Sequence, residues 1–121
     1  MDVRQKGKRK EREVAKFLND TFGTNCRRTP CSGGLSIKGD IIDVNPDSIL
    51  SNFHFEIKNQ EKLNIWQALA QSKRDASANK APIVIFSRNR EENYVAMHIN
   101  DFVNLLERIE EKNVVPGPGL S

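Results

Sequence analysis

The sequence lacks any long apolar run and holds few cysteines. None of its apolar stretches approaches the ~18 residues that a membrane-spanning helix requires. The first residues are charged, so we expect no signal-peptide core at the N-terminus. Cys26 and Cys31, the two cysteines of the chain, make neither a disulfide framework nor a zinc site. These absences argue against membrane proteins and disulfide-stapled secreted proteins, and they predict a soluble cytoplasmic protein, of cellular or viral origin, without a membrane partner.

Internal repeats and low-complexity blocks are also missing, and the length suits a single folded domain. The chain has 121 residues, of which 37% are hydrophobic and 29% are charged. This composition is too apolar for a disordered chain. We expect one domain over residues 1–112 and a flexible tail over 113–121, where proline and glycine alternate.

The charge is distributed unevenly along the chain. Residues 1–31 contain nine Lys/Arg and four Asp/Glu, whereas residues 32–121 contain ten and twelve, and the net charge is +3. Basic clusters favour polyanions, and acidic clusters favour metal ions or solvent. The pattern weakly favours an enzyme that acts on nucleic acid with a metal.

Apolar periodicity predicts the element order α-β-β-β-α-β-β-α. Helices are expected at about 5–20, from a cap at Asn64 to about 79, and after a cap at Asn100 or Asp101. Extended segments are expected at 25–28, 40–44, 52–58, 82–86 and 94–99. The fold class is therefore α/β, a single domain with a central mixed sheet flanked by helices.

The two later helices each carry apolar residues at helical spacing, which predicts a face that packs on the sheet. The side chains expected to point inward are Ile65, Trp66, Leu69 and Ala70 in the first of them, and Phe102, Leu105, Leu106 and Ile109 in the second.

The strongest chemical signal is the segment Glu56-Ile57-Lys58. Residues two apart on a strand point the same way, so the Glu56 carboxylate and the Lys58 ammonium project together, with Asp40 as an upstream acid. Mg²⁺ prefers oxygen ligands, and water bound to a metal is a better nucleophile. A lysine beside such a site orients water or stabilises charge on the phosphate. Glu–Lys pairs are also common on exposed strands. The neighbouring residues must therefore show whether this pair belongs to a catalytic site.

The first helix provides an independent indication. Glu11 falls on the same stripe as Val14, Ala15 and Leu18, whereas Glu13 falls on roughly the opposite side. A carboxylate on the core-facing side is costly unless it is paired or bound to a cation. The spacing therefore favours Glu11 over Glu13 as a site residue, with a Glu that reaches solvent as the plainer alternative.

Two further features indicate contacts with nucleic acid. The segment 28–34 combines an arginine, small hydroxyls and two glycines, which let backbone N–H groups approach phosphate. The N-terminal run holds more positive charge than solubility needs, which favours phosphate contacts over a merely solvated helix face. Its cations are Arg4, Lys6, Lys8, Arg9, Lys10 and Arg12.

In this order, Lys6-Gly7-x-x-x-Glu11-Arg12-Glu13, Arg28…Ser32-Gly33, Gly39-Asp40-Ile41 and Glu56-Ile57-Lys58 resemble the archaeal-type Holliday junction resolvases of the PD-(D/E)XK nuclease superfamily. The likeness covers residues 5–60 by motif and the later elements by order only. It implies a restriction-endonuclease-like αβββαβ core, a homodimer, and cleavage of four-way DNA junctions that depends on Mg²⁺, with Mn²⁺ as a substitute ion.

The resemblance also implies a role for each matching residue. Glu11, Asp40 and Glu56 would hold the metal, Lys58 would activate or orient water, and Ser32 would supply a loop hydroxyl needed for cleavage. The expected DNA contacts are Lys6, Lys8, Arg9, Arg12, Arg28, Ser32 and Gln60.

Several alternatives stay open. Gly39 stands where the superfamily motif has proline, and Asp43 competes with the preferred Asp40 as the metal ligand. His54 shares the face of Glu56, but a lone strand histidine is more often a packing residue than a ligand. Gln67 and Gln71 occur on the following helix without the tyrosine that accompanies a glutamine there in some related nucleases.

Two other functions compete with junction resolution. One is a PD-(D/E)XK nuclease of restriction, mismatch or nicking type, which would use the same catalytic residues. The other is a non-catalytic DNA-binding module on the same fold, against which the three carboxylates argue because binding phosphate does not require them.

Overall fold

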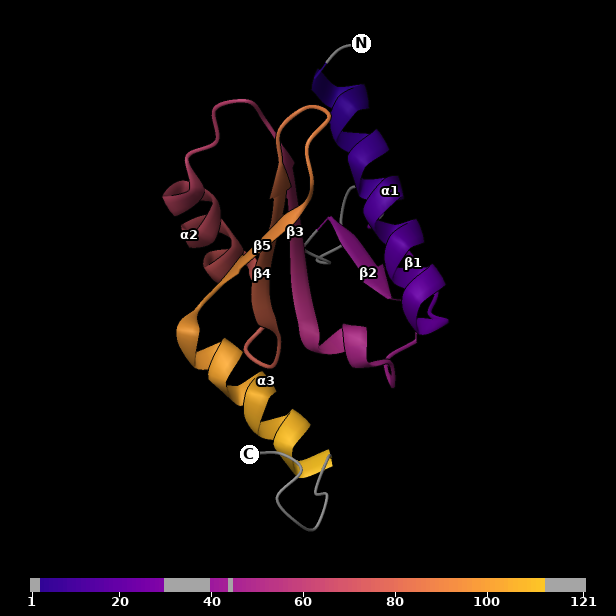
Figure 1. Cartoon of the computed structure of the whole chain (residues 1–121), viewed down its shortest axis with the longest axis vertical. Coiled ribbons are helices and arrows are strands. Elements are labelled where there is room, and N and C mark those ends of the chain that lie inside the picture. Colours follow the sequence, from indigo (N-terminus) through magenta and orange to yellow (C-terminus); the bar gives the residue numbers. More distant parts are fainter. Residues whose placement is uncertain (1–2, 30–39, 44, 113–121) are drawn as a thin grey trace.

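The computed structural model of the chain describes residues 3–29, 40–43 and 45–112. Its elements follow the expected order, with one short 3-10 helix added before the third strand (Figure 1). They are α1 (Val3–Phe22), β1 (Cys26–Arg28), β2 (Ile41–Asp43), η1 (Ile49–Asn52), β3 (Phe53–Asn59), α2 (Ile65–Asp75), β4 (Ala81–Ser87), β5 (Tyr94–Met97) and α3 (Ile99–Lys112).

The five strands form one mixed sheet in the order β1-β2-β3-β4-β5. All neighbours pair antiparallel except β3 and β4, which run parallel over their full length. Parallel neighbours require a crossover connection, and α2 supplies it. The fold is therefore a single small α/β domain with a mixed sheet, consistent with a restriction-endonuclease-like core.

Helix α1 covers one face of the sheet. Val14 and Ala15 are buried in a core cluster with Phe55 and Ile57 of β3. The helix ends at Phe22 because Gly23 adopts a φ of +64°, a conformation that closes a helix without steric cost for glycine. The expected helix, its stop and its inward stripe are confirmed.

Helix α2 covers the opposite face, which carries the polar side chains of β3. His54 and Glu56 are each only 4% exposed, and Val84 of β4 and Ser72 of α2 are fully buried. Strand β3 is thus covered on both sides, so its alternating sequence does not mark a solvent-facing strand. A buried Glu and His have to find partners in the fold.

The boundaries and the inward face of α2 differ in part from expectation. Asn64 caps the helix, because its Oδ1 accepts the Gln67 N–H at 3.2 Å, but the helix ends at Asp75 rather than near residue 79. The prediction that Trp66 is buried is wrong, since it is 78% exposed. Ala68 and Ser72, one turn apart, form the stripe against the sheet, and Trp66 lies about 200° from Ala68 around the helix. Ala70 is exposed for the same reason.

The prediction that α3 buries its apolar stripe is also wrong. Phe102, Leu106 and Ile109 are 50%, 48% and 54% exposed, and no residue of α3 is buried. The helix packs only lightly on the rest of the chain, through the side that carries the half-buried Leu105. Periodicity marks which face is apolar but not whether the same chain covers it.

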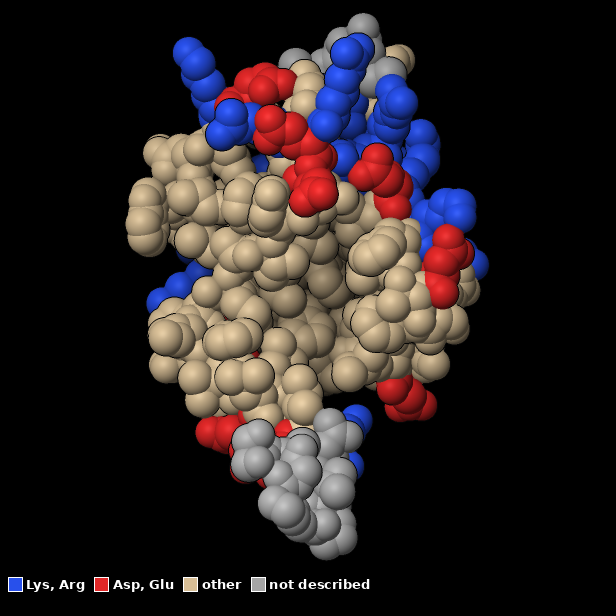
Figure 2. Space-filling model, viewed as in Figure 1, with Lys and Arg blue, Asp and Glu red and all other residues tan. Residues whose placement is uncertain are grey.

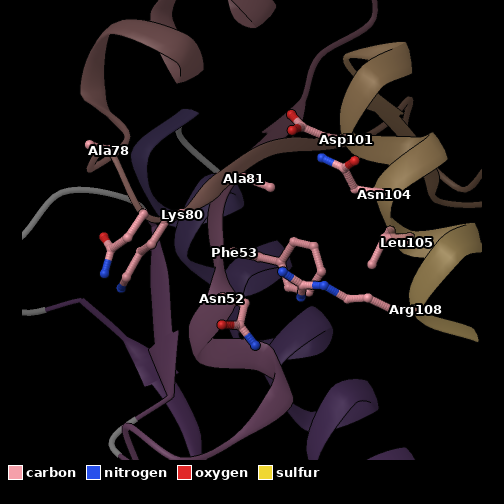
Figure 3. A pocket seen from close by; sticks show the side chains of 10 residues that line it. Asn52, Phe53, Ala78, Lys80, Ala81, Asp101, Asn104, Leu105 and Arg108 are labelled. Atoms are coloured by element: carbon pink, nitrogen blue, oxygen red, sulfur yellow. The ribbon is translucent and has the colours of Figure 1, made fainter. Parts of the chain in front are cut away.

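The start of α3 differs from the expected cap at Asn100 or Asp101. His98 occupies the capping place: its Nδ1 accepts the Asn100 N–H at 3.0 Å, and its carbonyl accepts from Asp101 and Phe102. Between α3 and the amino ends of β3 and β4 lies a hollow of about 180 Å³, lined in part by Phe53 and Arg108 (Figure 3).

Charge is unevenly spread over the surface. Lys and Arg gather toward the end of the molecule that carries the first turns of α1, and a broad surface across the middle of the view carries no charge (Figure 2). No described helix has the length and apolar character needed to cross a membrane.

Candidate active site

Asp40 lies where strands β2 and β3 separate. Its backbone N–H donates to Phe55 O at 2.7 Å, and its Oδ2 accepts the Ile57 N–H at 2.6 Å. In the pairing of β2 with β3, Ile41 lies opposite Phe55. Two residues further along β3, the Ile57 N–H is bound by the Asp40 side chain instead of by the backbone of β2. This contact brings its carboxyl group close enough to the Glu56 carboxyl for each group to shift the pKa of the other.

Glu56 is held from its other side by His54. His54 Nε2 lies 2.9 Å from Glu56 Oε1, and both side chains are almost fully buried. Residues two apart on a strand share a face, which is why these two groups meet. His54 therefore fixes the orientation of the Glu56 carboxylate.

The two carboxyl groups titrate as a coupled pair. Burial, followed by the charges of Glu56 and Glu11, raises the pKa of Asp40 to about 7, although the Ile57 N–H opposes the rise. Burial also acts to raise the pKa of Glu56, but the hydrogen bonds from His54 and Asp40 and the charge of Lys58 lower it below the ordinary value. In the absence of a cation, the raised pKa of Asp40 favours a proton on the pair up to near neutral pH.

Glu11 approaches this pair from α1. Its Oε1 lies 3.6 Å from Arg28 Nε of β1, in a largely buried ion pair. Burial raises the pKa of Glu11, Arg28 lowers it, and the charge of Glu56 raises it further. Glu13, by contrast, lies on the outer side of the helix and is bound by Lys10 at 2.7 Å. Glu11, and not Glu13, therefore interacts electrostatically with the carboxyl pair.

Lys58 lies on the same face of β3 as Glu56 and reaches across to α2. Its Nζ donates to Gln71 Oε1 at 3.3 Å. The sequence named Gln71 only together with Gln67 and did not choose between them, because the two glutamines stand one turn apart on one face of this helix. Only the packing of α2 on β3 distinguishes them: Gln67 is exposed and its N–H serves the helix cap.

Asp43 lies away from this group. Its Oδ1 accepts the Asn45 N–H at 2.9 Å, and its side chain faces Cys26 of β1. Burial, and then the charge of Asp43, raises the pKa of the Cys26 thiol. Of the two competing aspartates, only Asp40 is coupled to Glu56 and Glu11.

The acidic side chains of the candidate site offer oxygen donors to a metal ion. Among residues 3–29, 40–43 and 45–112, no three His, Cys, Asp or Glu side chains are gathered closely enough to coordinate one ion as they stand. Asp40 and Glu56, however, are two oxygen donors in contact, and Mg²⁺ is commonly held by one or two carboxylates plus waters and substrate phosphate. The pair fits Mg²⁺ or Mn²⁺, and the proton that it keeps is one that a cation would displace.

The expected DNA contacts fall on several surfaces. Lys6 and Arg9 line a hollow beside the loop between β4 and β5, whereas Arg12 lines another beside β1. Lys8 influences Glu11 electrostatically, and Arg28 is engaged by Glu11. Gln60 follows the last residue of β3 and is exposed, and Ser32 lies outside the described residues.

The chain was compared with known proteins. Residues 2–116 match a protein family described as "Phage putative PDDEXK endonuclease". A curated relative, Protein D14 of Escherichia phage T5, is 29% identical over 129 aligned positions that cover 89% of this chain and 79% of the relative. No solved structure gives a significant match. These matches support the PD-(D/E)XK superfamily, and nothing in them indicates an archaeal-type Holliday junction resolvase. The chain therefore belongs to this phage family of PD-(D/E)XK endonucleases.

Proposed function

We propose that the protein is a Mg²⁺-dependent, structure-selective DNA endonuclease that resolves four-way junctions by paired cleavage of phosphodiester bonds. The observation that carries the catalytic part is the buried Asp40–Glu56 carboxyl pair beside Lys58, at the place where β2 and β3 separate. Two neighbouring carboxyl groups removed from water are costly to ionise together, unless a cation binds between them.

Asp40 and Glu56 would hold Mg²⁺, with Mn²⁺ as a substitute, and Glu11 would complete the acidic side of the site. When bound, the ion supplies a more acidic water and positive charge for the phosphate in the transition state. His54 keeps the Glu56 carboxylate oriented, and Arg28 balances the charge of Glu11. Lys58 orients the attacking water or stabilises charge on the phosphate, while Gln71 holds its ammonium group in place.

Phosphate-driven binding is supported by the basic residues around the site. Lys6, Lys8, Arg9 and Arg12 lie on the helix that carries Glu11, and Arg28 is in contact with Glu11 itself. Gln60 lies just past the end of β3, the strand of Lys58. Affinity would then depend on salt and on DNA shape rather than on sequence.

A homodimer is part of the proposal. A four-way junction has approximate two-fold symmetry, so a symmetric dimer would present one site to each of two opposed strands. The uncovered apolar stripe of α3 supports self-association, because a protein that stays monomeric rarely exposes a large contiguous apolar patch. Its exposed members are Ile99, Phe102, Val103, Leu106 and Ile109.

Restriction, mismatch or nicking specificity fits the family equally well, because these activities share the catalytic residues.

A cleavage assay separates the candidates. Labelled four-way junction, fork and plain duplex are incubated with and without Mg²⁺, using Asp40→Asn and Lys58→Ala as inactive controls. Paired nicks in the junction, absent in both variants while binding persists, are expected. Equal cutting of duplex would replace junction resolution by another specificity, and binding without cutting in any metal would leave only a DNA-binding module.

A further inference from the structure

The loop between β4 and β5 meets the basic side of α1 around one hollow of about 860 Å³. The two segments are far apart in the sequence. The hollow is lined by Lys6, Arg9, Lys10 and Glu13 of α1 and by Asn89, Arg90 and Glu91 of the loop. The sequence alone does not show that Arg90 joins the N-terminal cations.

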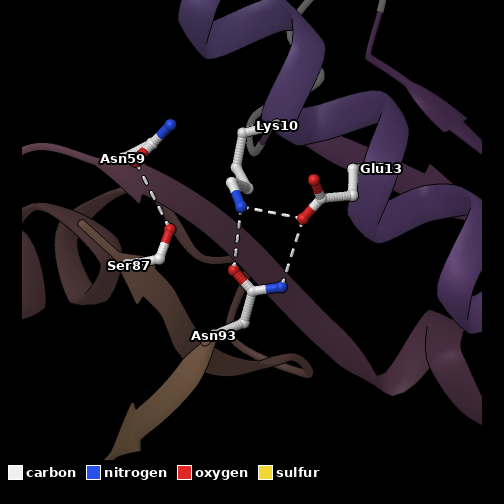
Figure 4. A network of polar contacts seen from close by, with 5 residues as sticks. All are labelled: Lys10, Glu13, Asn59, Ser87 and Asn93. Atoms are coloured by element: carbon white, nitrogen blue, oxygen red, sulfur yellow. Dashed lines mark hydrogen bonds and ion pairs between the residues drawn. The ribbon is translucent and has the colours of Figure 1, made fainter. Parts of the chain in front are cut away.

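Asn93 connects this loop to α1 by hydrogen bonds. Lys10 Nζ donates to Glu13 Oε2 at 2.7 Å and to Asn93 Oδ1 at 3.2 Å, and Asn93 Nδ2 donates to Glu13 Oε2 at 3.4 Å (Figure 4). A second tie is made by the Asn89 N–H, which donates to Glu61 Oε1 at 3.2 Å. The loop is therefore held at both ends, and one wall of the hollow is fixed relative to the other.

The remaining charges of the hollow are predominantly positive. The network uses the carboxylate of Glu13, whose pKa is lowered chiefly by the hydrogen bond from Lys10. Within the part of the chain that the structure describes, Lys6, Arg9 and Arg90 have no carboxylate within ion-pair distance, and Glu91 is the one acidic residue of the hollow besides Glu13. Three uncommitted cations facing one open hollow favour an anionic ligand.

Arg90 adopts a backbone conformation that is uncommon for its residue type. Its φ is 60°, in the left-handed region, which only glycine adopts without cost. Such strain is found where the surrounding structure holds a side chain in a set place. The contacts of Asn89 and Asn93 lie on either side of Arg90, which lines the hollow together with residues of α1.

Residues on or beside the two walls of the hollow adjoin residues of the candidate active site in the sequence. The loop starts after Ser87, whose Oγ donates to Asn59 Oδ1 at 3.4 Å, and Asn59 directly follows Lys58 (Figure 4). On the other wall, Lys10 directly precedes Glu11. Lys10, which lines the hollow, is thus the chain neighbour of Glu11, whereas Asp40, Glu56 and Lys58 do not line it.

We propose that this hollow binds the sugar–phosphate backbone of the DNA next to the cleaved phosphate, with Arg90 as the contact on the loop and Asn93 as its positioning residue. The proposal rests on the proposed nuclease function and adds a second wall to the basic surface of α1. Backbone contacts carry no sequence information, which matches recognition by shape.

The test measures DNA binding without cleavage. Fluorescein-labelled four-way junction is titrated in EDTA at several salt concentrations with wild type, Arg90→Gln, Arg90→Lys and Asn93→Ala. Loss of one phosphate contact should raise the Kd about tenfold and lower the slope of log K against log salt by about 0.9. Arg90→Lys should retain most of the affinity. Asn93→Ala should weaken binding with little change of slope, since it removes no cation.

The matched control is Arg74→Gln on α2, an exposed arginine on the opposite face of the sheet. Circular dichroism establishes that each variant folds. If Arg90→Gln binds as tightly as Arg74→Gln and keeps the wild-type slope, the hollow is not a DNA site, even when the wild type cleaves normally. If the wild type itself fails to bind DNA, the proposed function and this inference both fall.

Discussion

Asp40 and Ile57 are joined by a hydrogen bond of 2.6 Å from the Ile57 N–H to Asp40 Oδ2. The Asp40 side chain binds a backbone N–H of β3 that has no hydrogen-bond partner in the backbone of β2. The contact fixes the partly buried Asp40 carboxyl near Glu56. The acidic pair at the centre of the site is therefore a consequence of the short β2.

The raised pKa of Asp40 predicts that Asp40→Asn stabilises the metal-free protein at neutral and higher pH. Folding raises this pKa from 3.8 to about 7, so the folded state binds the proton more tightly than the unfolded state. The stability contribution is present below pH 4 and is lost as pH rises through about 7. We expect Asp40→Asn to unfold at a higher urea concentration above pH 7, by about 1–3 kcal/mol, and to match wild type near pH 4.

The exposed Asp47→Asn serves as the control for this measurement, because Asp47 lies in a turn outside the site. It should follow the wild-type pH dependence throughout. An Asp40→Asn variant that is less stable than wild type at pH 8 would contradict a protonated, strained pair.

The same proton predicts pH-dependent metal binding. A cation at Asp40 and Glu56 must displace the proton on Asp40, so affinity for Mn²⁺ should rise as pH increases from 6 to 8 and proton release should decline. Calorimetry in two buffers of different ionisation enthalpy measures both quantities. Glu56→Gln should lose binding, and equal affinity at the two ends of the pH range would count against this ligand pair.

Lys58 should affect catalysis far more than binding. Lys58→Met removes the ammonium group beside Glu56, and we expect cleavage to slow about 10²–10³-fold, the cost of losing one transition-state contact. Junction affinity in EDTA should change little. Gln71→Leu, which releases Lys58 Nζ, should slow cleavage less than Lys58→Met does. A Lys58→Met variant with near-normal single-turnover rates would remove the lysine from the mechanism.

Substitutions at Glu11 and Glu13 provide a matched comparison on helix α1. Glu11→Gln leaves Arg28 with no carboxylate and takes charge from the metal side of the site, so metal affinity or activity should fall about 10–100-fold. Glu13→Gln breaks an exposed ion pair worth at most about 1 kcal/mol and should leave metal affinity unchanged. Manganese titration of both proteins gives the comparison, and equal effects would refute the distinction.

The exposed stripe of α3 predicts a dimer that a single charge disrupts. Light scattering of the wild type should give twice the mass of one chain, and Leu106→Glu should give one chain mass at the same concentration, because an unpaired charge in an apolar interface is costly. Lys112→Glu also introduces a carboxylate, at the end of the helix and outside the apolar stripe, and should stay dimeric. A monomeric wild type, or a dimeric Leu106→Glu, would exclude this surface.

Local sequence determined most of the fold. Apolar spacing, the Asn64 cap and the Gly23 stop placed the elements, and the Glu56-x-Lys58 spacing and the helical position of Glu11 marked the acidic site, because these depend on periods of 2.0 and 3.6 residues. The same rules failed for Trp66 and for α3, since a period identifies a face but not the layer that covers it.

The remaining features were decided only by tertiary structure. The link from Asp40 to Ile57, the burial of His54 against Glu56, the contact of Gln71 with Lys58 and the meeting of Arg90 with α1 join residues through the packing of separate elements. No local pattern encodes such distances. Sequence thus indicated which groups are candidates for the chemistry, and the packed sheet and helices decided which of them stand together.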